Sequence, residues 1–217
     1  EISECLVGSE MCIRDSSPNA AVVVATIRAL KMHGGVPKAE LGTENLSALE
    51  AGLPNLARHV SNMKTVFGLP VVVAVNRFPT DTDREIAFLM EKCREMGVNA
   101  VLSTVHAEGG KGAEALAREV VRLCEEETAD FRFAYPDEMS LTEKVETVVR
   151  RVYGGAGVAL LPAAKKQLDA LEALGFGNCP VCIAKTQYSF SDDPTKVGAP
   201  EGLSLIHISE PTRHSLI

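Results

Sequence analysis

The sequence contains no tryptophan and few other aromatic residues, only three Tyr and seven Phe among 217 residues. Proteins that bind single-stranded nucleic acid stack bases on aromatic side chains, so this composition argues against that class. Basic residues are also outnumbered, with 22 Lys and Arg against 29 Asp and Glu, which disfavours a general nucleic-acid binder. No apolar run approaches the roughly 18 residues of a membrane span, and no secretory signal is visible at the N-terminus. We therefore expect a cytoplasmic protein with reduced cysteines and without nucleic-acid or membrane partners.

The two ends of the chain differ in character from the rest. Leu6–Ser16 reads LVGSEMCIRDS and Leu203–Arg213 reads LSLIHISEPTR, and neither segment has a clear period. A DNA sequence that encodes the second segment also encodes LVGSEMCIRD on its opposite strand, and it resembles a transposase adapter used in sequencing libraries. We therefore predict that residues 1–16 and 203–217 are translated adapter, without core packing or sheet pairing, and that the native part is roughly 17–202.

Short apolar segments alternate with amphipathic ones along residues 17–130. Strands are predicted at three apolar runs, Ala20–Ala25, Pro70–Val75 and Val98–Thr104. Helices are predicted between and after them, at Thr26–His33, Thr43–Gly52, Pro54–Phe67, Asp81–Met96 and Gly112–Glu127. This alternation is typical of βαβ units, so we predict an α/β fold of three layers, with a mainly parallel sheet and helices on both faces.

The pattern changes near Phe131–Asp137, where we place a domain boundary that divides residues 17–135 from residues 136–202. The second part begins with a capping-box spacing, Ser140-Leu-Thr-Glu143. It continues with four predicted elements: a helix at Ser140–Tyr153, a short strand after the Gly154–Gly157 break, a helix at Pro162–Leu174 and a strand at Pro180–Ala184.

The strongest local signal is the sequence NRFPTD directly after the second predicted strand. Asn76 and Arg77 lie at the carboxyl end of that strand, where doubly wound sheets bind ligands. Phe78 offers a ring face, and Asp81 offers a carboxylate to exocyclic amines or ribose hydroxyls. The loop is similar to the N-[KR]-x-x-x-D loop with which many P-loop nucleotidases hold a base. Alternatively, Asn76 bonds to loop backbone, and Asp81 or Thr82 caps the next helix.

Two other segments could bind anions. Arg28, Lys31 and His33 follow the first strand, where cations suit an anionic substrate, although the same residues are compatible with a solvated helix face. Gly109–Gly112 follows the third strand and opens a helix, the order required for anion binding at a helix N-terminus. It lacks the Ser or Thr and the spacing of a Walker A loop, so a plain turn is an equal alternative.

Two segments near residue 190 carry further chemistry. Cys179–Cys182 is a CxxC motif, but a strand is predicted after it where a thioredoxin-type site has a helix, and no second Cys/His pair has zinc spacing. No metal site is therefore predicted. Lys185–Pro194 is dense in hydrogen-bonding groups, which is compatible with a ligand-binding loop or with an Asx/Ser-rich turn.

Taken together, these segments closely resemble the formate–tetrahydrofolate ligase family. The resemblance covers essentially all of residues 17–202, about the middle third of a family member, and it rests on blocks in the family's order. The blocks are VATIRALKMHGG (24–35), VVVAVNRFPTDT (71–82), EGG (108–110), EKVETVVRRVYGGAGV (143–158) and PVCIAKTQYSFSDDPT (180–195). The chain departs from the family in having no Walker-like GK[ST] loop, no Trp near Val105–His106, and Cys179 in place of a more usual apolar residue.

The resemblance implies an ATP-dependent ligation with a P-loop-NTPase-like fold, in which formyl phosphate formylates N10 of tetrahydrofolate. It implies small-molecule substrates (formate, ATP and tetrahydrofolate), Mg²⁺ with the ATP, a monovalent cation, and a homo-oligomer for the intact enzyme. Residues 17–135 would then be the nucleotide-binding domain without its P-loop, and residues 136–202 would lead toward the folate and formyl-phosphate subdomain. Because the P-loop is absent, we expect this chain by itself to be inactive.

The resemblance also assigns candidate residues to three groups. Asn76, Arg77, Phe78 and Asp81 would hold the adenine. The catalytic candidates on the phosphate or formate side would be Arg28, Lys31 and His33, and the folate and formyl-phosphate pocket would be bordered by Lys185, Thr186, Gln187 and Tyr188. The alternatives that stay open are another P-loop-type ATP-dependent ligase or ATPase, a cytosolic CxxC redox protein, and a catalytically silent scaffold.

Overall fold

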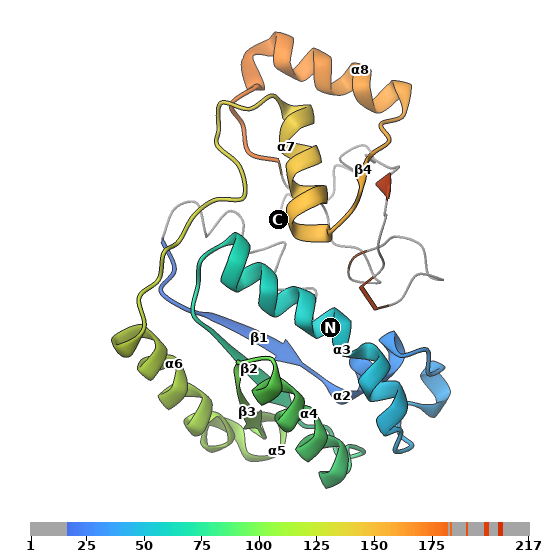
Figure 1. Cartoon of the computed structure of the whole chain (residues 1–217), viewed down its shortest axis with the longest axis vertical. Coiled ribbons are helices and arrows are strands. Elements are labelled where there is room, and N and C mark those ends of the chain that lie inside the picture. Colours follow the sequence, from blue (N-terminus) through green and yellow to red (C-terminus); the bar gives the residue numbers. More distant parts are fainter. Residues whose placement is uncertain (1–16, 182, 184–189, 191–197, 200–203, 206–217) are drawn as a thin grey trace. The chain divides into compact units, whose positions relative to one another are not determined.

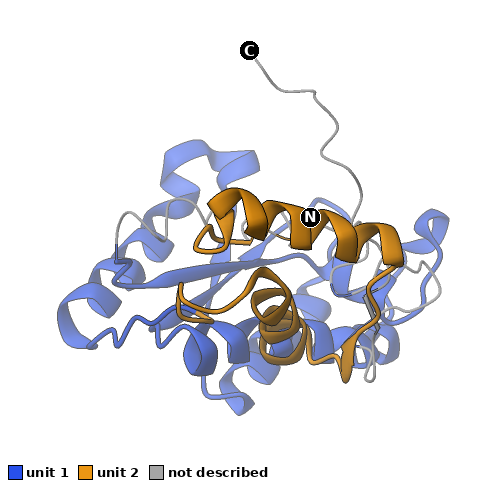
Figure 2. Cartoon of the chain, turned by 90° about the horizontal axis from the view of Figure 1, so that it is seen from above, with its two compact units in different colours: residues 1–133, 184–200 blue, residues 134–183, 201–217 orange. Residues whose placement is uncertain are grey.

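A computed structural model of the chain describes residues 17–181, 183, 190, 198–199 and 204–205. The chain divides into two compact units (Figure 2), of which unit 1 comprises residues 1–133 and 184–200, and unit 2 comprises residues 134–183 and 201–217. Among the described residues, no helix combines the length and the apolar character that crossing a membrane requires.

The described residues of unit 1 form a parallel sheet of three strands in the order β1-β2-β3 (Figure 1). The strands are β1 (Ala21–Ala25), β2 (Val71–Asn76) and β3 (Asn99–Ser103). Ala25 pairs with Val75 at the end of β1, and Asn76 pairs with Ser103 at the end of β3. The predicted parallel arrangement is therefore confirmed, and the carboxyl ends of all three strands lie at one edge of the sheet.

Helices connect the strands, as the alternating pattern predicts. The crossover from β1 to β2 contains α2 (Ile27–His33) and α3 (Leu46–Ser61), and the crossover from β2 to β3 contains α4 (Asp83–Glu95). After β3 come α5 (Val105–Glu108) and α6 (Glu114–Glu126). Shorter turns complete the unit: 3₁₀ turns at Lys38–Glu40 and Gly109–Ala113 and a π-helical turn at Asn62–Val66.

The central strand β2 is apolar on both faces because both faces are covered. Val71, Val73 and Val75 belong to one core, together with Leu30 from α2 and residues of α3 and α4. Val72 and Ala74 point to the opposite face and are buried as well, and α6 packs against β2 and β3 outside that core. Unit 1 thus has the three layers predicted for an α/β fold.

The predicted helix break at Leu53–Pro54 is wrong, because α3 continues through Pro54 without interruption. A proline in a helix interior costs about 3 kcal/mol through the lost N–H bond and the steric clash of its ring. Leu49 and Leu56, on either side of Pro54, are both fully buried in the same core. Their burial is worth about 1.5–3 kcal/mol each, enough to offset the proline.

The described part of unit 2 contains two helices and a small sheet. The predicted capping box is confirmed at the start of α7 (Leu141–Val148), where Ser140 and Glu143 bond to each other's backbone N–H groups. The helix continues as a π-helical turn, Val149–Tyr153. The other elements are β4 (Gly157–Val158), α8 (Pro162–Leu171), a π-helical turn at Glu172–Phe176 and β5 (Ser204–Leu205).

Two predictions about unit 2 are wrong. Residues 203–217 were expected to have no sheet pairing, yet Ser204–Leu205 pairs in parallel with Gly157–Val158, because backbone N–H and C=O groups pair along a free strand edge whatever the side chains are. The strand predicted at Pro180–Ala184 is not formed at the described positions Pro180, Val181 and Ile183. Instead, the Tyr135 hydroxyl accepts from Val181 N at 2.9 Å and donates to Val181 O at 3.1 Å, which satisfies that backbone without a strand partner.

The packing of α2 on α3 depends on glycine. A Cβ atom built on Gly52 of α3 would lie 1.9 Å from the Leu30 carbonyl oxygen, and one built on Gly34 would lie 1.9 Å from the Ala48 carbonyl oxygen. The two helix backbones therefore approach so closely that neither position accommodates a side chain.

We predict that Gly52→Ala destabilises the chain by about 1–3 kcal/mol, the usual cost of overpacking, although alanine favours a helix by about 1 kcal/mol over glycine. Gly110→Ala is the matched control, since a Cβ atom there meets nothing within 4 Å. Urea unfolding of the two variants and the parent measures the difference. A Gly52→Ala midpoint at or above that of the parent would contradict the close approach.

Candidate active site

The loops that follow β2 and β3 enclose a pocket of about 210 Å³ at the carboxyl edge of the sheet. A hydrogen bond from Arg77 N to Ser103 O, at 3.1 Å, extends the β2–β3 pairing into the first loop. The pocket is lined by Arg77, Phe78, Pro79, Thr104, His106 and Ala107. Arg77 and Phe78 were predicted as site residues, and the structure brings them together with a second loop.

Phe78 and Asp81 close a tight turn directly after β2. Phe78 N donates to Asp81 Oδ2 at 2.8 Å, and Asp81 N donates to Phe78 O at 3.0 Å. Asp81 is buried, and among the described residues its Oδ1 has no hydrogen-bond partner. Burial raises the pKa of this carboxyl above its ordinary value, against the opposing effect of the Phe78 amide. Of the two residues considered as helix caps, Thr82 is the cap of α4 and Asp81 is not.

Positive charge lies beside the Phe78 ring. The exposed Arg28 guanidinium of α2 lies over the ring, with its carbon 5.5 Å from the centroid, a cation–π contact worth roughly 0.5–1 kcal/mol at exposed sites. Arg77 forms a partly exposed ion pair with Asp83 at 2.9 Å. The structure thus places an aromatic face and two guanidinium groups around one loop, a combination suited to a flat ligand that carries negative charge.

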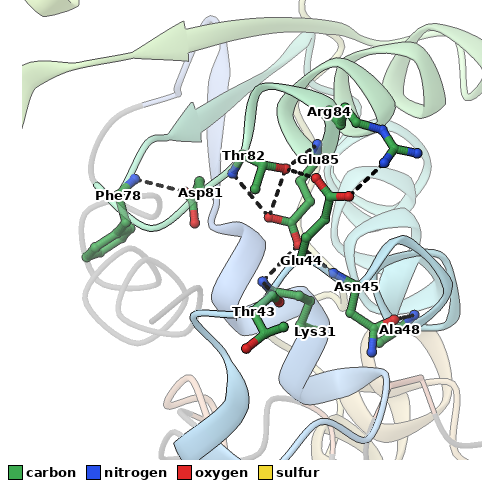
Figure 3. Close-up of polar contacts among 10 residues, drawn as sticks. All are labelled: Lys31, Thr43, Glu44, Asn45, Ala48, Phe78, Asp81, Thr82, Arg84 and Glu85. Atoms are coloured by element: carbon green, nitrogen blue, oxygen red, sulfur yellow. Dashed lines mark hydrogen bonds and ion pairs between the residues drawn. The ribbon is translucent and has the colours of Figure 1, made fainter.

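Lys31 and His33, the other two catalytic candidates, are buried. Lys31 Nζ lies 2.8 Å from Glu85 Oε1 and 2.9 Å from the Thr43 carbonyl oxygen (Figure 3). Neither side chain of the Lys31–Glu85 pair is exposed. His33 Nδ1 accepts from Gly198 N at 3.1 Å, and burial lowers the pKa of His33 below its ordinary value. In this structure only Arg28 of the three is open to a substrate.

Sequence reasoning missed three residues around this site. Glu85 is the third residue of α4, and the Thr-x-x-Glu spacing of Thr82 to Glu85 was the signal that could have found it. Thr104 and His106 line the pocket only because β3 is parallel to β2 and ends beside it. No spacing in the sequence marks them.

Several predicted features lie outside the described residues. These are the folate-side candidates Lys185, Thr186, Gln187 and Tyr188, as well as Cys182 of the CxxC motif and most of the two flanks. Cys179 is described, and it is exposed and not in a disulfide. Within the part of the chain that the structure describes, no three His, Cys, Asp or Glu side chains are grouped as metal ligands would be.

The family model for formate–tetrahydrofolate ligase matches residues 9–212 of the chain. The chain belongs to this family. Its members are ATP-dependent ligases that use tetrahydrofolate as a substrate, which places the chain in one-carbon metabolism. The matched range begins inside residues 1–16 and ends inside residues 203–217, so the adapter origin of the flanks stays a prediction.

Membership of the formate–tetrahydrofolate ligase family decides between the interpretations that the sequence left open. It argues against another P-loop-type ATP-dependent ligase or ATPase and against a CxxC redox protein. It agrees with the α/β sheet of unit 1, in which three parallel strands are flanked by helices. The P-loop-NTPase-like class stays a prediction.

A buried histidine of α3 makes the stability of the chain depend on pH. His59 of α3 is buried and stacks on Phe190, with ring centroids 4.5 Å apart and planes at 26°. Burial, followed by the charge of His33, lowers the pKa of His59 to about 4. In the unfolded chain the imidazole has its ordinary pKa of 6.5 and binds a proton that the folded state excludes.

The His59 contribution to stability is therefore complete above pH 6.5 and is lost as the pH falls toward 4. We predict that His59→Phe, which keeps an aromatic ring and removes the titration, weakens the pH dependence between pH 7 and 4.5 by about 1–3 kcal/mol. The control is His106→Phe, which replaces an exposed histidine. Denaturant unfolding at several pH values measures the slopes, and equal slopes for the parent and His59→Phe would contradict the assignment.

Proposed function

We propose that the chain is part of a ligase that joins formate to tetrahydrofolate through formyl phosphate, and that the pocket between the β2 and β3 loops binds the adenine of ATP. The observation that carries this proposal is the position of Phe78. Its ring lines the pocket at the carboxyl edge of a parallel sheet, and the Arg28 guanidinium lies over it. Ligands of open α/β sheets bind at such edges.

The size of the pocket supports a single ring system. Its volume of about 210 Å³ lies below the roughly 300–1,000 Å³ of pockets for drug-sized ligands. An adenine ring would stack on Phe78, with the backbone and side-chain groups of Arg77 and Thr104 beside it. Two nearby groups can bond to ring or ribose donors: Asn76, at the end of β2, and Asp81, one of whose buried oxygens has no partner among the residues that the structure describes.

The proposed chemistry needs positioning and charge more than reactive side chains. A formate oxygen attacks the γ-phosphorus of ATP, the bond from that phosphorus to the ADP oxygen breaks, and formyl phosphate forms. N10 of tetrahydrofolate then attacks the formyl carbon, phosphate leaves, and 10-formyltetrahydrofolate results. Mg²⁺ on the phosphates would neutralise charge that develops during transfer. We assign neither Mg²⁺ nor a monovalent cation to residues of this chain.

The exposed Arg28 is the described group best placed to face the phosphates of a nucleotide whose base lies on Phe78. Lys185, Thr186, Gln187 and Tyr188 remain the proposed border of the folate and formyl-phosphate pocket. Homo-oligomerisation of the intact enzyme also remains a proposal.

Phe78→Ala in an intact ligase that contains this sequence tests the adenine assignment. Base stacking on an aromatic ring is worth about 1–3 kcal/mol, so the ATP KM should rise by about tenfold to a hundredfold, while the formate and tetrahydrofolate KM values change little. Phe133→Ala, at a partly exposed ring elsewhere in unit 1, is the control. An unchanged ATP KM together with a raised tetrahydrofolate KM would assign the pocket to the pterin ring instead.

We further propose that the 217-residue chain does not turn over ATP by itself. The sequence has no GK[ST] motif, and Gly109–Gly112 (GGKG) lacks the hydroxyl that a P-loop provides for Mg²⁺. A coupled assay for ADP, with formate and tetrahydrofolate present, should find no release above that of a no-protein blank. ADP release that scales with the concentration of the chain would refute this proposal.

A further inference from the structure

A single buried carboxylate ties together three segments around the candidate site. Glu85 Oε1 accepts from Lys31 Nζ at 2.8 Å and from Asn45 N at 3.0 Å, and Glu85 Oε2 accepts from Thr82 N at 3.2 Å (Figure 3). Lys31 belongs to α2, Asn45 is the residue that caps α3, and Thr82 is the residue that caps α4. Glu85 therefore connects α2 to the residues that cap α3 and α4.

The contacts of Glu85 favour the charged form of its carboxyl. Burial by itself would raise the pKa of the Glu85 carboxyl, but the bonds from Lys31, Asn45 and Thr82 lower it below its ordinary value. Lys31 has no exposed surface, and its ammonium is also bound by the Thr43 carbonyl oxygen. The amine is thus held by the protein and is not offered to a substrate.

Each residue of the pair lies near a residue that contacts Phe78. Thr82 follows Asp81, whose carboxylate and amide close the turn on Phe78. Arg28 lies three residues before Lys31, one turn earlier on α2, and its guanidinium lies over the Phe78 ring. The Lys31–Glu85 pair therefore joins α2, which carries Arg28, to the start of α4, which directly follows the Phe78–Asp81 turn.

Stability alone does not account for a buried ion pair, because well-packed apolar side chains of similar volume are often as stable or more stable. We infer that Lys31 and Glu85 are positioning residues for substrate binding, which hold the Phe78–Asp81 turn and Arg28 in the geometry that binds the ring. This inference rests on the proposed function only for the identity of the ring. The pair should affect whichever substrate Phe78→Ala affects.

The test is the double variant Lys31→Met/Glu85→Leu in an intact ligase that contains this sequence. Apolar residues in both positions should leave the thermal midpoint at or near that of the parent. Since the link from α2 to Thr82 is gone, the KM of the substrate bound at Phe78 should rise by about tenfold, with kcat and the other two KM values changing little. The exposed ion pair Arg84–Glu44 provides the control, and Arg84→Met should leave all three KM values unchanged.

A parent-like KM in a folded double variant would overturn the inference, because the pair would then serve stability alone. Glu85→Gln keeps the test decisive if the double variant does not fold. Its amide oxygen can still accept from Lys31 and Asn45, but its amide nitrogen cannot accept from Thr82 N. A KM rise of about threefold or more for the same substrate is expected, and no rise would overturn the inference.

The two proposals fail in distinguishable ways. If Phe78→Ala and the double variant both raise the tetrahydrofolate KM and leave the ATP KM unchanged, the adenine assignment is wrong and the positioning role stands. If Phe78→Ala raises the ATP KM and the double variant raises none, the adenine assignment stands and the positioning role is wrong.

Discussion

The buried carboxylate of Glu85 is the constraint on which the site geometry of unit 1 depends. A charge with no exposed surface must be fully bonded, and this one accepts from Lys31, Asn45 and Thr82, which lie on three different segments. Those segments can then move only together, since separating any of them leaves a buried charge short of a partner. Because an unpaired buried charge is costly, the contacts of Glu85 hold the loops around Phe78 in one arrangement.

The parallel sheet contributes a second constraint of a different kind. Parallel strands must be joined by crossovers, so the loop that follows each strand emerges at the same edge. Here that geometry places the NRF loop after β2 against Thr104 and His106 after β3. The pocket exists because of the topology, and the side chains that line it decide what it can bind. The sheet gives the position of the site, and the residues give its chemistry.

The VATIRALKMHGG segment shows how one short motif can combine both kinds of role. Arg28 is exposed and contacts Phe78, while Lys31 and His33 on the same helix are buried and bond to Glu85 and Gly198. The first of the two glycines that end the motif has a packing role, since Gly34 lies against the Ala48 carbonyl. The three basic residues are therefore close in sequence, but only Arg28 is exposed at the site.

The sequence by itself determined the parallel α/β architecture, because β2 is apolar at its first five positions, Val71–Val75, and only a sheet covered on both faces buries such a strand. It also determined the family, and it identified the loop from Asn76 to Asp81. Only the tertiary structure decided that α3 continues through Pro54, that Lys31 pairs with Glu85, and that His106 faces the same pocket as Phe78. The physical reason is that periodicity and spacing report local preferences, whereas burial and charge pairing depend on which distant segment packs nearby. Residues 31 and 85 are far apart in the chain, and the need to bury their charges as a pair is met only when the sheet brings α2 and α4 together.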